Sequence, residues 1–217
     1  MKKITLLLVI TLLITLTGCK SKEEITGGYT LENSVAGTLP ENAKAAFDEA
    51  TKDDSHSYEP LALLSAQVVS GTNFAILVKE KDELKILIIY KPISGETKIT
   101  SKSEFNMLDY LTKNINIVKD EETLMGGWNV PEDGGLTKMP QELATSSYQA
   151  FQDLDEINLE PLCLLGTQVV SGINYALICR GKVTNKYNLY MVELYVDTNS
   201  NPKVITIEPI DIKQYTK

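Results

Sequence analysis

Two stretches of the chain show the same succession of hydrophobic patterns: one helical stripe, followed by four runs typical of strands. The helical stripes have apolar residues every three or four positions, and a proline opens each helix at Pro40 and Pro140. The first stripe consists of Leu39, Ala43, Ala46, Phe47 and Ala50, and the second of Met139, Leu143, Ala150, Phe151 and Leu154.

The strand-like runs that follow the first helix cover residues 58–69, 73–79, 84–91 and 97–105. Those that follow the second helix cover residues 159–170, 174–181, 187–197 and 203–210. A helix followed by an antiparallel meander is an α+β pattern. The sequence therefore predicts two α+β domains, each with one helix packed on a four-stranded antiparallel sheet.

The run at 187–197 is apolar on both of its faces. Tyr190, Val192, Leu194 and Val196 alternate on one side, which we assign to the core under the helix. Leu189, Met191 and Tyr195 lie on the other side. Because one helix covers only one face of a sheet, the second face packs against the other repeat, mediates association with another molecule, or remains ordinary exposed apolar surface.

The predicted organisation has five parts. They are a leader at 1–19, a tether at 20–26, a first domain at 27–105, a polar linker at 106–124 and a second domain at 125–217. Each domain has its own helix stripe and four strands, so we expect each half to fold when it is expressed alone.

The leader has the features of a bacterial lipoprotein signal peptide. Lys2 and Lys3 precede an apolar run at 4–17, which is short for a bilayer span of about 20 residues. The run ends in Leu-Thr-Gly-Cys, which resembles a lipobox. Cleavage there would leave lipid-modified Cys19 as the N-terminus and anchor the protein outside the cytoplasm, in the cell envelope. A plain signal peptide and an uncleaved anchor are the alternatives.

The chain is acidic, with 29 acidic and 21 basic side chains. Loss of Lys2 and Lys3 with the leader would bring the net charge from −8 to about −10. An acidic surface argues against nucleic acid as a partner and against electrostatic attraction to anionic lipid. Membrane attachment would then depend on the lipid on Cys19 alone.

One motif occurs twice, 101 residues apart. QVVSG at residues 67–71 and at 168–172 is followed in both copies by one residue, an asparagine and an aromatic residue. Each copy lies between two strand-like runs, where Ser-Gly favours a hairpin turn. Upstream of each copy there is a Gly-Gly-aromatic segment, at 27–29 and at 126–128.

A QxVxG hairpin preceded by an N-terminal glycine segment resembles the cystatins, a family of inhibitors of papain-like cysteine proteases, and two copies resemble a tandem cystatin. The resemblance implies that these elements enter the protease cleft and occlude it without any chemical reaction. The residues it assigns to the protease contact are Gln67, Val68, Val69, Ser70, Gly71, Gly27 and Gly28 in the first repeat, and Gln168, Val169, Val170, Ser171, Gly172, Gly126, Gly127 and Trp128 in the second.

The chain departs from the family in its last hairpin loops, at 92–96 and 197–202. Neither loop has the tryptophan that is usual there, since the only tryptophan is Trp128. The alternative function is therefore a non-inhibitory binding module of the cell envelope, built on the same fold. In that case QVVSG is only a tight turn that duplication has copied.

Cys163 and Cys179 flank the second QVVSG motif almost symmetrically. In a regular hairpin they would face each other across adjacent strands, and a disulfide is plausible outside the cytoplasm. The alternative is a buried apolar pair, because the same offsets in the first repeat fall on Ala62 and Val78.

The sequence offers little that is typical of an enzyme. Its only histidine, His56, lies in a polar stretch between helix and strand, where we expect a solvated loop residue. The sequence has no catalytic Cys/His or Ser/His pattern, no metal-ligand spacing and no glycine-rich phosphate loop. We therefore expect neither catalysis nor a cofactor or metal.

Overall fold

The computed structural model describes residues 29–30, 39–111, 128–129, 139–184 and 186–216. The glycine segments before Tyr29 and Trp128, the leader with Cys19, and most of the predicted linker lie outside these residues. The first half contains β1 (Tyr29–Thr30), α1 (Glu41–Thr51), β2 (Glu59–Val69), β3 (Gly71–Glu80), β4 (Glu83–Pro92), β5 (Lys98–Glu104) and the 3₁₀ helix η1 (Met107–Asp109). The second half contains β6 (Trp128–Asn129), α2 (Gln141–Gln152), β7 (Asn158–Val170), β8 (Gly172–Val183), β9 (Lys186–Asp197), β10 (Pro202–Ile210) and the 3₁₀ helix η2 (Ile212–Tyr215).

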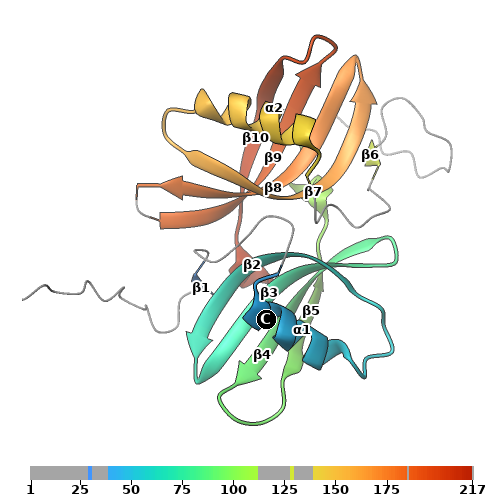
Figure 1. The fold of residues 1–217 in the computed structure, drawn as a ribbon, viewed down its shortest axis with the longest axis vertical. Helices are drawn as coiled ribbons and strands as arrows, with labels where there is room; N and C mark the ends of the chain where they lie inside the picture. Colours follow the sequence, from blue (N-terminus) through green and yellow to red (C-terminus); the bar gives the residue numbers. More distant parts are fainter. Residues whose placement is uncertain (1–28, 31–38, 112–127, 130–138, 185, 217) are drawn as a thin grey trace, which may run out of the picture.

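The predicted α+β architecture is confirmed in both halves. Each half has four long antiparallel strands in chain order, with one helix packed against the sheet (Figure 1). A two-residue strand, β1 or β6, adds to the edge of each sheet beside β2 or β7. These two short strands were not predicted, because two residues are too few to show an alternating pattern.

The predicted helix stripes form the two outer cores. Ala43, Ala46 and Phe47 of α1 pack with Leu63, Ile76 and other residues of the first sheet, and Leu39 and Ala50 flank them. In the second half, Leu143, Ala150 and Phe151 of α2 pack on Leu177 and Val192. No helix among the described residues is long and apolar enough to cross a membrane.

The opposite, helix-free faces of the two sheets belong to one core that both halves share. This shared core includes Leu64 and Leu77 of the first sheet and Leu165, Ile178 and Met191 of the second, all of them fully or almost fully buried. The second apolar face of 187–197 thus packs against the other repeat, which is one of the three alternatives that the sequence left open. Leu189 and Met191 of this face are buried in the shared core, whereas Tyr195 lies outside it, beside the second QVVSG turn.

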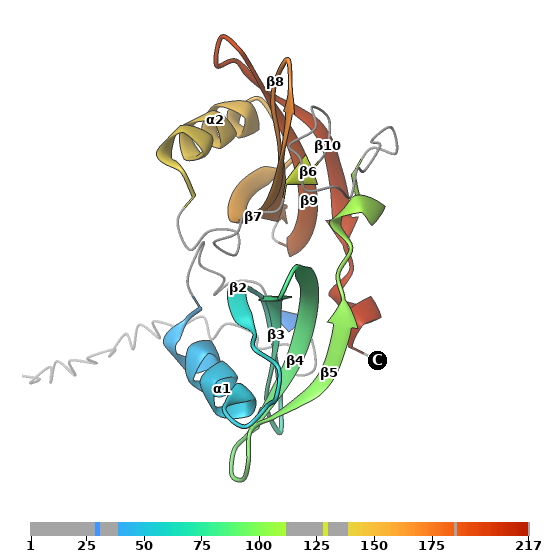
Figure 2. The same cartoon turned by 90° about the vertical axis from the view of Figure 1, so that its right-hand side faces the viewer.

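The segments after β5 and β10 extend this shared core across the boundary between the halves. In Figure 2, η1 lies at the height of the second sheet and η2 at the height of the first. Tyr215 of η2 accepts a hydrogen bond from Ser101 of β5, and its hydroxyl lies 2.9 Å from that of Tyr110. Met107 and Leu111 are buried, so the predicted polar linker begins with residues that belong to the core.

Cys163 and Cys179 form no disulfide and are both buried, as in the second of the two alternatives for this pair. Near the turn, Gln168 pairs with Asn174, a register that would place Cys163 opposite Cys179. An irregularity between Leu164 and Gly166 shifts the register by one residue, which turns the two thiols to opposite faces. Burial raises the pKa of Cys163 to about 12.

The shared core leads us to revise the expectation that each half folds alone. A half without its neighbour would expose the apolar face that contains Leu64 and Leu77, or Ile178 and Met191. We expect residues 20–111 and 125–217 to aggregate or self-associate when they are expressed separately, and to co-purify as a one-to-one complex when they are co-expressed. Size-exclusion chromatography with light scattering checks this, and a stable, folded monomer of either half would contradict it.

Candidate functional site

The two QVVSG motifs form hairpin turns at the ends of their sheets. The chain reverses at Ser70 between β2 and β3, and at Ser171 between β7 and β8. In Figure 1, the first turn lies at the lower end of the molecule and the second at the upper end, so the turns point away from each other. Tyr29 pairs with Gln67 and Trp128 with Gln168, so the residue that follows each glycine pair lies beside the motif.

The glutamine of each motif makes a hydrogen bond across the hairpin. Asn73 donates to Gln67 Oε1 at 2.9 Å, and Asn174 donates to Gln168 Oε1 at 2.7 Å. In both copies the glutamine and the asparagine are directly opposed in the register. The asparagine that follows QVVSG is therefore the structural partner of the glutamine.

A tyrosine from the next strand caps each turn. Tyr90 of β4 donates its hydroxyl proton to the carbonyl oxygen of Ser70 at 2.8 Å, and Tyr195 of β9 donates to that of Ser171 at 2.5 Å. Both tyrosines pair in the register with the asparagine of the motif, at Asn73 and Asn174. This contact was not predicted, because each tyrosine lies about 20 residues from the turn that it caps.

The glycine of each motif is required by its backbone conformation and by its close packing. Gly71 has φ +145° and Gly172 has φ +134°, a region that L side chains rarely adopt. A Cβ atom would lie 2.4 Å from the carbonyl oxygen of Lys91 at the first site and from that of Val196 at the second. No rearrangement of a flexible side chain could relieve either clash, since both atoms belong to the backbone.

The two valines of each motif, in contrast, are exposed. Val68 and Val69 have 39% and 36% of their surface accessible, and Val169 and Val170 have 50% and 40%. The glutamine, the glycine and the backbone carbonyl of the serine thus have a structural role in the turn, whereas the paired valines present apolar surface to solvent. Both valines of each pair end a strand, β2 or β7, where β-branched residues are favoured, and in both copies they leave apolar surface exposed beside the turn.

The turn next to each motif differs between the repeats. The register pairs Gly71 with Pro92, so the loop between β4 and β5 lies beside the first QVVSG turn. Ile93 in this loop is 88% exposed. Ile93 was not among the site residues predicted from the sequence. An isoleucine within a Pro-to-Gly turn was nevertheless a signal, because turns favour polar residues.

The corresponding loop of the second repeat, between β9 and β10, is polar and internally bonded. The carboxylate of Asp197 accepts hydrogen bonds from the backbone of Asn199 and Asn201, both at 2.8 Å. The side-chain amide of Asn201, which donates to Asp197 Oδ2 at 2.9 Å, holds the pKa of Asp197 below its usual value, and the two backbone bonds add to this effect. The second repeat therefore presents a rigid polar loop where the first presents an isoleucine.

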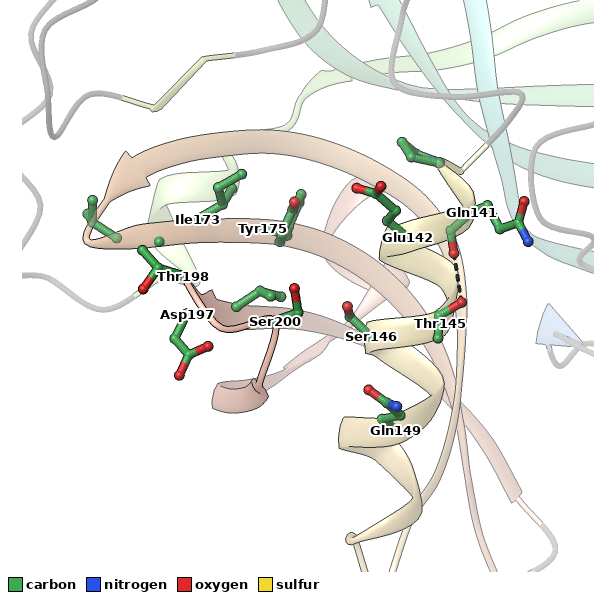
Figure 3. A pocket seen from close by; sticks show the side chains of 14 residues that line it. Gln141, Glu142, Thr145, Ser146, Gln149, Ile173, Tyr175, Asp197, Thr198 and Ser200 are labelled. Carbon is green, nitrogen blue, oxygen red and sulfur yellow. Dashed lines mark hydrogen bonds between the residues drawn. The ribbon is translucent and has the colours of Figure 1, made fainter.

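An open groove of about 1210 Å³ runs between the start of α2 and the second QVVSG turn. Figure 3 shows Glu142 and Ser146 of α2 facing Tyr175 and Ile173 of β8, with Asp197 at the far side. Burial and the nearby carboxylate of Glu142 raise the pKa of Tyr175. The groove combines an apolar floor with acidic and hydroxyl groups on its walls.

His56 is less isolated than the sequence indicated. Its backbone and its Nδ1 both bond Asp54 Oδ1, at 2.9 and 2.7 Å, and its Nε2 lies 3.7 Å from Glu80 Oε1. The bonds from His56 lower the pKa of Asp54, and Glu80 is also bonded by Lys85 at 2.7 Å. These contacts of His56 connect the loop after α1 with the end of β3.

No group of three or more His, Cys, Asp or Glu within the described ranges is placed to hold a metal ion.

Comparison with known proteins gives no family assignment. No protein-family model matches the chain, and no curated protein matches it.

The close packing of the glycines predicts a specific effect on stability. Replacing Gly71 or Gly172 with alanine should lower the free energy of unfolding by about 2 kcal/mol or more, because positive-φ strain and a backbone clash add. Gly95→Ala is the matched control: Gly95 also has positive φ, but its nearest neighbour is 3.7 Å away. Urea unfolding should rank Gly95→Ala as the mildest variant, and equal losses for all three would contradict the role of the clash.

Proposed function

We propose that this protein is a lipid-anchored, cystatin-like inhibitor of papain-like cysteine proteases, which blocks their clefts with its QVVSG turns. The observation that carries the proposal is the exposed pair of valines at the tip of each turn. The helix and antiparallel meander in each half agree with the fold that the resemblance implies. No reacting group is needed, because inhibition occurs by occlusion.

The chemistry of the turn suits a narrow apolar cleft. Full burial of a valine contributes about 1.5–3 kcal/mol. Because the valines are already partly buried in the free protein, roughly 1 kcal/mol for each remains to be gained on binding. The Gln–Asn bond, the tyrosine cap and the glycine fix the turn beforehand, so little conformational entropy would be lost on docking.

The N-terminal glycines support the same proposal through their position in the sequence. Gly28 directly precedes Tyr29, and Gly127 directly precedes Trp128, the two residues that pair with the motif glutamines. A glycine segment can follow a protein surface closely because it has no Cβ atom. Gly27, Gly28, Gly126 and Gly127 are therefore proposed as the second element of the contact.

The missing tryptophan of both repeats favours the alternative function, and so does one feature of the second repeat. There the loop beside the turn is polar, and the adjoining groove has acidic walls at Glu142 and Asp197. A non-inhibitory binding module of the cell envelope would use this groove and the turn for another protein ligand. In the first repeat, Ile93 provides an exposed apolar group beside the turn and favours inhibition.

The proposed anchor has a direct test. Cys19→Ser should abolish lipid attachment and leave unprocessed precursor, because the thiol is the group that would be acylated. Metabolic labelling with a fatty acid and membrane fractionation measure the two effects. A serine variant that is still acylated and remains with the membrane as before would contradict the proposal.

The proposed contact predicts a loss of inhibition when charge is placed on the turn. In a soluble form that begins at Lys20, Val169→Asp with Val170→Asp should raise the inhibition constant of the second repeat about 100-fold or more, because two carboxylates would be desolvated without partners. The thermal midpoint should stay almost unchanged, since both side chains face solvent. To isolate this repeat, the test is made in a background that carries Val68→Asp and Val69→Asp.

Val183→Asp is the matched control. Val183 is an exposed valine of the same sheet, beside the turn between β8 and β9 and away from the motif. This variant should inhibit as the parent does. If the soluble protein inhibits no papain-like enzyme at high micromolar concentration, the binding-module alternative replaces the inhibitor. Equal inhibition by the double Asp variant would place the contact elsewhere.

A further inference from the structure

We propose that one chain binds two protease molecules at once, one at each end. This inference rests on the proposed function but goes beyond it, because a duplicated motif can equally leave one turn blocked or make the two turns compete for one partner. The geometry of the turns and the way in which the halves are joined decide between these arrangements.

Both turns are stabilised by the same contacts. Each has the glutamine–asparagine bond, the tyrosine cap and a glycine at positive φ, and these bonds differ by no more than about 0.3 Å between the copies. These structural parts would be kept in any turn that folds, so they show only that both turns have the same shape. We infer that both turns bind from the valines, because both pairs remain exposed at equivalent positions.

Neither turn is covered by the residues of the other half that the structure describes. The exposed fractions of Val68, Val69, Val169 and Val170 hold with both halves in place. Contacts between the halves involve instead β2 with β7, β5 with η2, and the residues of the shared core. The junction therefore leaves the motif end of each sheet open.

The junction also holds the two turns apart. The shared core and the Tyr110–Tyr215 contact join the halves into one packed unit, so the turns cannot swing together onto one partner. In both views the turns lie at opposite ends of the long axis of the molecule (Figures 1 and 2). Two partners that approach along this axis would be separated by the full length of the inhibitor.

The two ends are not equivalent. The first end adds the exposed Ile93 to its valines, whereas the second adds a groove with Glu142 and Asp197 on its walls. We therefore expect two binding steps of different affinity. The second end should be the more sensitive to salt, because its acidic groups interact with charges on the partner.

The stoichiometry tests this inference. The soluble form, from Lys20 to Lys217, is titrated with papain whose catalytic cysteine is blocked by a methylthio group, and the mass of the complex is measured by sedimentation velocity. In excess papain the expected complex contains one inhibitor and two papain molecules. Val68→Asp with Val69→Asp, and separately Val169→Asp with Val170→Asp, should each reduce it to one-to-one.

The other outcomes separate the two proposals. A one-to-one complex of the parent protein would overturn bivalent binding while leaving inhibition intact, whether one turn is inactive or the turns compete. The two double variants would then show which of these applies. If the parent forms no complex with papain, the proposed function itself fails, and bivalent binding fails with it. The variant with all four substitutions should form no complex, and a complex that persists would overturn binding at the turns.

Discussion

The arrangement of this molecule depends on the burial of the helix-free faces of its two sheets against one another. Each sheet is apolar on both sides, and a single helix covers only one of them. Desolvation of the second face therefore requires the other repeat. This one constraint joins the halves and places η2 beside β5. The ends of the sheets that carry the QVVSG turns then face away from the junction.

Periodicity was sufficient to predict the elements and the outer cores. The helix stripes, the eight long strands and the α+β class follow from patterns within short windows of the sequence, and all of them are confirmed. Register could not be predicted in the same way. The irregularity between Leu164 and Gly166 moves Cys163 to the face opposite Cys179, although the symmetric spacing around the turn indicated that they would meet.

The candidate site, like the fold, could be predicted from local sequence patterns only in part. The QVVSG motif was visible as a repeated string, but the sequence could not distinguish its structural residues from those free to bind. Tyr90 and Tyr195 show why, because each reaches its turn through a strand pairing that no local pattern encodes. These contacts involve the glutamine, the glycine and the backbone carbonyl of the serine, and they leave the valines as exposed apolar surface.

The central claim is that the QVVSG turns are the surfaces that meet a protease. Hydrogen exchange of the soluble protein, with and without blocked papain, tests it most directly because it locates the contact without any mutation. The account predicts slower exchange at residues 68–72 and 169–173, with no change at the β3–β4 and β8–β9 turns at the other ends of the sheets. Protection confined to those other turns, or to the groove wall on α2, would contradict it.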